Sequence, residues 1–169
     1  MIQALITAEQ IIALAFEDKN FSPAYIADDI IIEVQQGNIR DSIGKKYYEE
    51  LLSQTTANTV TTANKEIIEN YLKKSIAWFV KAKIAPGHAA KMVNAGIVSN
   101  TVEYGNVASS TNIQNLISAS LSSANFWLTD AMKYMEDDAN KINYPTYNNN
   151  KSCDTGSGRT NPIRSWVNL

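Results

Sequence analysis

Few residues of this chain have the chemistry of a catalytic or metal-binding group, and their spacing does not bring them together. The one histidine, His88, follows a Pro-Gly pair and has no second histidine or cysteine nearby. A zinc site or a histidine-activated nucleophile needs such partners at defined spacing. The one cysteine, Cys153, lies in a polar segment with no evident base or helix start to activate its thiol. We therefore interpret His88 as an ordinary exposed or capping residue.

Two pairs of adjacent acids, Asp28-Asp29 and Asp137-Asp138, have groups that could bind a cation or share a proton. Neighbouring residues on a helix point about 100° apart, so one site cannot easily use both carboxylates, and we interpret both pairs as solvated helix faces. The stretch GSGRT from Gly156 lacks the lysine and the strand-to-helix context of a phosphate-binding loop. The sequence thus predicts no catalytic residue, no metal site, no cofactor and no enzymatic activity.

Length, charge and cysteine count narrow the class of protein. A chain of 169 residues fits one domain. Its 17 acidic residues nearly balance its 15 basic ones, which argues against a general nucleic-acid binder. One cysteine excludes a disulfide framework and favours a reducing compartment. We see no signal peptide and no apolar stretch near the ~20 residues that span a bilayer, so we expect no membrane partner.

Helices would position the candidate residues named above. The apolar spacing predicts an α-helical domain over residues 1–143, interrupted by a loop and an insertion. Thr7 with Gln10 forms a capping box, and Ser22 followed by Pro23 begins a second helix. The expected helices cover residues 8–18, 23–39, 45–54, 64–85 and 112–143, with an exposed Thr-rich loop at 55–64 and Asn64 as a cap. We expect the two long helices, 64–85 and 112–143, to pack together as the central pair of a small all-α bundle.

An insertion at about 96–110 departs from the helical pattern. The β-type residues Val98, Val102, Tyr104 and Val107 alternate there with Gly, Asn and Ser. We expect an extended loop or a weak β-hairpin that contacts a partner or lines a lumen.

Residues 144–169 form the second departure, because they are rich in Asn, Ser, Gly and Thr and carry little core material. The segment nevertheless ends on Pro162, Ile163, Arg164 and Trp166. Exposure of the Ile163 and Trp166 side chains to water is unfavourable unless a partner covers them. We therefore expect a flexible C-terminal arm, with a tether at about 148–160 and a tip that binds a partner. The alternative is that Trp166 folds back onto the chain's own helical domain.

The order of several phrases resembles a known family. ITAEQIIALAF, SPAYIADDIIIEVQQGNIRDSIG, KKYYEELL, ENYLKKSIAWFVKAKIAP and NAGIV follow one another in the chain. Over roughly residues 6–142 they resemble the small head–tail connector proteins of tailed bacteriophages, most like those of crAss-like phages of Bacteroidales. The resemblance rests on helix order and character, not on a catalytic signature.

The resemblance implies a structural subunit of the virion neck, made in the host cytoplasm. Such subunits form a dodecameric ring beneath the portal protein, extend the DNA channel and offer a platform to further neck or tail proteins. The partners implied are the portal, copies of the same chain, and genomic DNA as transient cargo. The alternative function is a monomeric helical adaptor or regulatory module that binds its partner through the C-terminal tail.

Overall fold

A computed structural model describes residues 4–17, 21–94 and 110–153, with side chains for 4–17, 21–87 and 111–149. All regular structure within these ranges is helical, which confirms the all-α fold. Val98, Val102, Tyr104 and Val107 of the expected insertion lie outside the described residues.

Most of the described chain belongs to helices joined by short turns. In chain order they are α1 (Ala8–Ala15), the 3-10 turn η1 (Pro23–Tyr25), α2 (Asp28–Val34), the π-helical segment η2 (Gln35–Arg40), α3 (Asp41–Ile43), α4 (Lys45–Thr56), α5 (Thr62–Ile67), the π-helical segment η3 (Ile68–Leu72), α6 (Lys73–Asn94), α7 (Ser110–Glu136), the 3-10 turn η4 (Lys141–Asn143) and α8 (Pro145–Cys153). Gly44 separates α3 from α4 with a φ of 87°, which glycine adopts most readily.

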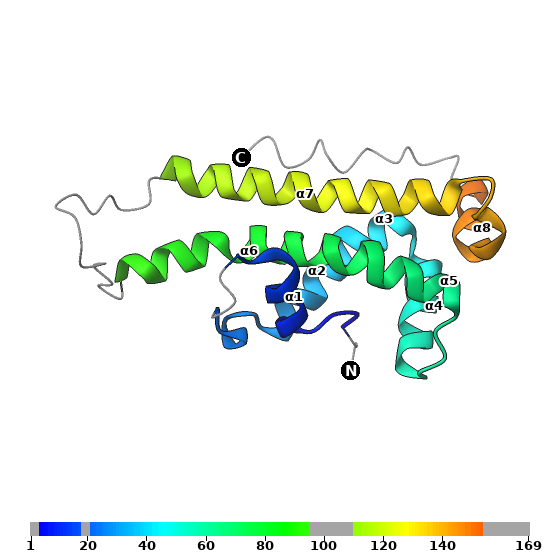
Figure 1. Cartoon of the computed structure of the whole chain (residues 1–169), viewed down its shortest axis with the longest axis horizontal. Coiled ribbons are helices and arrows are strands. Elements are labelled where there is room, and N and C mark those ends of the chain that lie inside the picture. Colours follow the sequence, from blue (N-terminus) through cyan, green and yellow to red (C-terminus); the bar gives the residue numbers. More distant parts are fainter. Residues whose placement is uncertain (1–3, 18–20, 95–109, 154–169) are drawn as a thin grey trace.

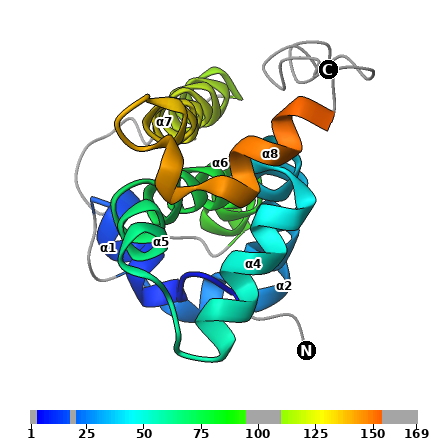
Figure 2. The ribbon, with the colours of Figure 1, turned by 90° about the vertical axis from the view of Figure 1, so that its right-hand side faces the viewer.

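Helix α6 lies at the centre of the molecule. It pairs along its length with α7, and α1 and α2 pack against its other sides (Figure 1). Viewed from one end, α1 lies on one flank of α6 and α2 and α4 lie on the other, while α8 crosses the end of the helix pair (Figure 2). The apolar residues of α6 accordingly occur around much of its circumference, as in other enclosed helices.

The contact between α6 and α7 confirms the central pair that the sequence predicts. Helix α7 buries one stripe of residues against α6: Ser120, Ala124, Leu128, Ala131 and Met135. Three of these are small, so the two backbones approach closely, and the Ser75 hydroxyl donates to the Ala124 carbonyl oxygen at 2.9 Å. On the partner side, Leu72 at the end of η3 and Ile76 of α6 are fully buried, and both of these elements contact α7.

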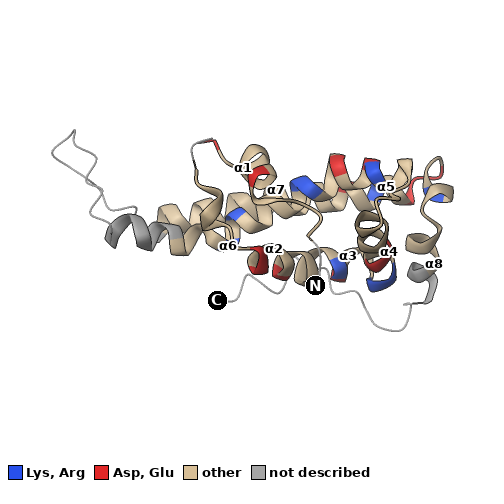
Figure 3. Ribbon diagram, turned by 90° about the horizontal axis from the view of Figure 1, so that it is seen from below, with Lys and Arg blue, Asp and Glu red and all other residues tan. Residues whose placement is uncertain are grey.

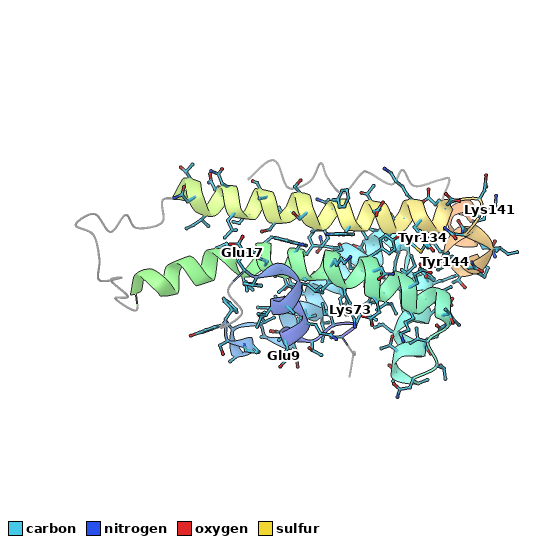
Figure 4. The ribbon with its side chains drawn as sticks, in the orientation of Figure 1. Glu9, Glu17, Lys73, Tyr134, Lys141 and Tyr144 are labelled. Atoms are coloured by element: carbon cyan, nitrogen blue, oxygen red, sulfur yellow. The ribbon has the colours of Figure 1, made fainter. Side chains whose placement is uncertain are left out.

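Tyrosines join the helices at the α8 end of the molecule. The Tyr47 hydroxyl donates to Asn64 Oδ1 at 2.8 Å, and the Tyr144 hydroxyl donates to the Ala63 carbonyl oxygen at 3.1 Å. The Tyr147 hydroxyl donates to Glu136 Oε1 at 2.7 Å. Tyr144 also packs on Tyr134 of α7, with ring centroids 6.3 Å apart (Figure 4).

This cluster corrects the expected start of the C-terminal arm at residue 144. Tyr144 and Tyr147 are each only 1% exposed, and Pro145 begins α8 instead of ending the helical domain. The polar composition of 144–153 gives no sign of this, because the segment is attached to the core mainly by its two buried tyrosines. The last described residue of the helical domain is therefore Cys153.

Two further expectations are corrected by the local structure. The cap of the long helix is Thr61, whose hydroxyl accepts from the Asn64 amide, whereas the Asn64 side chain is buried among Tyr47, Glu50 and Gln54. Helix α4 extends through Thr56, so the exposed connection before Thr61 is shorter than expected.

Substituting Leu72 tests the central pair. Leu72→Ala should lower the free energy of unfolding by about 2–5 kcal/mol, as for other leucines removed from a core, because Leu72 is 0% exposed. Leu116 of α7 is 43% exposed, so Leu116→Ala should change it by about 0.5 kcal/mol. Urea unfolding measures both, and a loss at Leu72 as small as that at Leu116 would contradict the core assignment.

The tyrosine cluster predicts a loss of stability in alkali. Burial, with a contribution from Tyr134, raises the pKa of Tyr144 from 10.0 to about 12, and burial likewise raises the pKa of Tyr47. The folded chain favours the neutral hydroxyls, so their contribution is present below pH 10 and is lost as the pH rises toward 12. Unfolding measured across this range should show the decline, and Tyr144→Phe should flatten it. A Tyr144→Phe slope equal to that of the intact chain would exclude Tyr144 as its source.

Candidate binding groove

An apolar groove able to hold a ligand runs along one flank of the α6–α7 pair, with a volume of about 250 Å³. Phe79 and Ala82 of α6 line its buried side, and Ile117 and Leu121 of α7 line one wall. The opposite wall comes from α2 and η2, through Val34 and Gly37. Helix α6, helix α7 and the continuous α2–η2 segment are distant from one another in sequence. Together they enclose a surface suited to apolar side chains.

One ion pair lies among the residues that line the groove. Lys83 Nζ of α6 lies 2.6 Å from Glu33 Oε1 of α2. Both side chains are well exposed, so the pair adds at most about 1 kcal/mol to stability. It gives an otherwise apolar groove a charged edge, with which a ligand carrying a charge could also pair.

The π-helical segment η2 shapes the wall that contains Gly37. The buried side chain of Gln35 holds this segment in place: its Oε1 accepts from the Leu5 amide at 2.7 Å, and its Nε2 donates to the Tyr48 hydroxyl at 3.2 Å. No atom lies within 4 Å of the position that a Cβ would occupy at Gly37. The absence of a side chain at Gly37 therefore leaves open space in the groove, and π-helical turns are frequent at functional sites.

The other flank of the α6–α7 pair is filled by side chains. Lys74 Nζ lies 4.0 Å from the centre of the Trp127 ring, and Lys81 Nζ lies 4.7 Å from that of Trp78. Lys81 also donates to the Ala15 carbonyl oxygen at 2.8 Å, at the C-terminal end of α1, where a cation is favourable. Burial lowers the pKa of Lys81. This flank attaches α1 to α6 and leaves the groove on the opposite side.

Charged residues do not form a single-sign surface around these elements. Acidic and basic residues are interspersed along the helices in the view from below (Figure 3). The described residues contain no group of three or more His, Cys, Asp or Glu able to hold a metal ion. Within the same part of the chain, no helix has the length and apolarity needed to cross a membrane.

The structure places the acidic pairs in structural positions. Asp28 and Asp29 are exposed in the first turn of α2, where acids favour the helix dipole. Asp138 pairs with Lys141 at 2.6 Å in the turn after α7, and this hydrogen bond holds the pKa of Asp138 below its usual value. Asp137 Oδ1 accepts from the Ala139 amide in the same turn.

The structure describes only part of the other residues singled out from the sequence. His88 and Cys153 are described in backbone only, in α6 and α8. Pro162, Ile163, Arg164 and Trp166 of the arm lie outside the described residues. The sequence does not predict the groove, because Val34, Phe79 and Leu121 fit the apolar spacing of ordinary helix cores. The glycine at position 37, inside an otherwise apolar helical pattern, was the one available signal.

Residues 39–157 match the model of a family of unknown function, DUF6712. The chain belongs to this family. The DUF6712 match includes α4 through α8, and so the complete α6–α7 pair, but begins within η2, after Val34 and Gly37. No curated protein and no solved structure matches the chain.

The groove predicts an unusual effect of adding a side chain at Gly37. Gly37→Ala should raise the free energy of unfolding by about 0.5–1 kcal/mol, because alanine suits a helical backbone better and its methyl group meets no atom. Gly44→Ala is the contrasting variant and should lower stability, because its φ is 87°. Thermal unfolding compares the two, and a destabilised Gly37→Ala would show that this wall is closed.

Proposed function

We propose that this DUF6712 member is a structural protein of a phage virion, the subunit of a ring that joins the portal to the tail and extends the DNA channel. Its partners are the portal protein, neighbouring copies in a dodecameric ring, and further neck or tail proteins. The resemblance of residues 6–142 to head–tail connector proteins supports this proposal. In this function the chain has no enzymatic activity and is located in the virion neck.

The observation that carries the proposal is the uncovered side of α7. This helix meets α6 along one stripe, while Phe126 is 62% exposed and Leu116 is 43% exposed. A neighbouring protein packed on this side of α7 would remove both apolar side chains from water, which is favourable. A long, rigid pair of helices with one uncovered side suits a subunit that packs against neighbours.

The groove adds a second, different apolar surface on the same helix pair. It lies between α7 and α2, and Phe126 is not among the residues that line it. Contacts between two different surfaces of identical subunits are head-to-tail, and they close into a ring when the rotation between subunits allows it. The two surfaces therefore supply the kind of contact that a cyclic assembly needs.

The charge distribution is compatible with a channel for DNA. The formal net charge is −2, and the face in Figure 3 is mixed in sign. Strong phosphate contacts would hold DNA in place through counterion release. A channel through which DNA slides gains from the absence of a strongly basic surface, so near-neutral charge does not oppose the proposal.

Electron microscopy of the chain mixed with its phage's portal protein tests this function. We expect additional density with the symmetry of a ring on the tail-facing end of the portal, and a monomer when the chain is purified alone. Deleting residues 159–169 should prevent joining while leaving the melting temperature within a few degrees. Portal particles without added density, with both proteins folded, would favour the monomeric adaptor instead.

A pair of surface variants makes the test specific to α7. Phe126→Asp should abolish the ring density, because it places a charge where we expect a neighbour to pack. Ile142→Asp is the matched control, since Ile142 is 81% exposed but lies in η4, beyond the end of α7. Circular dichroism should show both variants folded, and a ring formed equally well by both would exclude the α7 surface.

A further inference from the structure

The groove lies on the side of the molecule toward which the C-terminal segment leaves the helical domain. Helix α8 crosses the end of the α6–α7 pair and ends on the flank where α2 and α4 lie (Figure 2). Asn148 Nδ2 of α8 donates to the Met135 carbonyl oxygen at 3.1 Å, which attaches α8 to the last turn of α7. The described chain therefore ends at Cys153, on the flank of the helix pair where the groove lies.

We propose that in the free subunit residues 162–166 of the chain's own C-terminal segment occupy this groove. The segment runs back from α8 along α7 and places the Ile163 and Trp166 side chains between α7 and the η2 wall. The occupant is thus a peptide with apolar anchors, and it comes from the same chain.

The length of the segment fits this path. At about 3.3–3.6 Å per extended residue, residues 154–162 reach about 30 Å beyond Cys153. Leu121 lies about 22 Å from the end of α7 at Glu136, at about 1.5 Å per helical residue. Residues 154–162 are therefore longer than the part of α7 between Glu136 and Leu121 without being fully extended, which leaves residues 163–166 for the groove.

The chemistry of the segment matches that of the groove. Phe79, Ala82, Ile117 and Leu121 offer apolar contacts to the isoleucine and tryptophan side chains. Glu33 at the groove gives Arg164 a carboxylate partner, which it would share with Lys83. Pro162 restricts the backbone just before the anchors and so reduces the entropy lost on docking.

Tethering favours the chain's own segment over that of a second copy. A short flexible tether gives the segment an effective concentration in the millimolar range. At lower protein concentrations, the groove therefore binds the segment of the same chain in preference to that of another copy. The contact covers the apolar tip and the groove together in the free subunit. Ring assembly then exchanges it for contacts with the portal or a neighbour, a step that rests on the proposed function, whereas the docking does not.

Cross-linking of the full-length chain tests the docking. With Cys153→Ser as background, Asn38→Cys places a thiol among the lining residues of the groove, and Ser165→Cys places one between the anchors without removing them. A short bis-maleimide, applied at about micromolar protein concentration and thus far below the effective concentration, should give a cross-linked species with the mass of a monomer. A dimer mass would assign the groove to a second copy and overturn the proposal.

The control variant carries its thiol on the other flank of α7. Ser123 is two residues from Leu121 and so lies about 200° around the helix. Ser123→Cys with Ser165→Cys should give about tenfold less monomeric cross-link than the Asn38→Cys pair. The reason is that docking in the groove holds residue 165 near residue 38 and away from residue 123. Equal yields from the two pairs, or no cross-link from either, would overturn the proposal.

Filling the groove provides the second measurement. Gly37→Leu adds a side chain where no atom lies within 4 Å, and it should remove most of the Asn38→Cys cross-link. Gly87→Leu is the matched variant, because Gly87 is also helical and open but does not line the groove, and it should leave the yield unchanged. Unchanged yield with Gly37→Leu would overturn the proposal. All samples lack the portal, so failure of the ring assay and failure of docking are separate results.

Discussion

The close contact between α6 and α7 is the interaction on which the rest of the structure depends. Ser120, Ala124 and Ala131 keep the interface thin, and the Ser75 hydroxyl satisfies its hydrogen bond on the Ala124 carbonyl oxygen. Helix α6 therefore contacts α7 closely on one side, while α1 and α2 pack against the other sides of α6. Bulkier residues in this stripe would push α7 outward and separate the walls that form the groove.

The same contact explains why α7 is only partly covered. A helix that buries one stripe leaves most of its circumference to solvent or to other proteins. One flank of the pair is closed by Lys74, Trp78, Lys81 and Trp127, and Lys81 also binds the end of α1. The other flank stays open because Gly37 contributes no side chain and η2 is held back by Gln35. The groove is thus a consequence of how α1 and α2 are fixed to α6.

The tyrosine cluster determines where the C-terminal segment starts. Tyr144 and Tyr147 bury their rings among α4, α5 and α7 and use their hydroxyls on Ala63 and Glu136. Asn148 adds a hydrogen bond from α8 to the Met135 carbonyl oxygen of α7. Together these contacts fix α8 across the end of the helix pair, and the described chain ends there at Cys153.

The sequence by itself determined the helical fold, the capping box at Thr7 and the two long apolar stripes, at 64–85 and 112–143, that form the central pair. These depend on local periodicity and capping, which nearby residues specify. Only the tertiary structure decided that Asn64 is buried rather than a cap, that Tyr144 and Tyr147 belong to the core, and that Val34, Gly37, Phe79 and Leu121 share a groove. Each of these depends on contacts between residues distant in sequence, and helical periodicity carries no information about which faces of different helices meet.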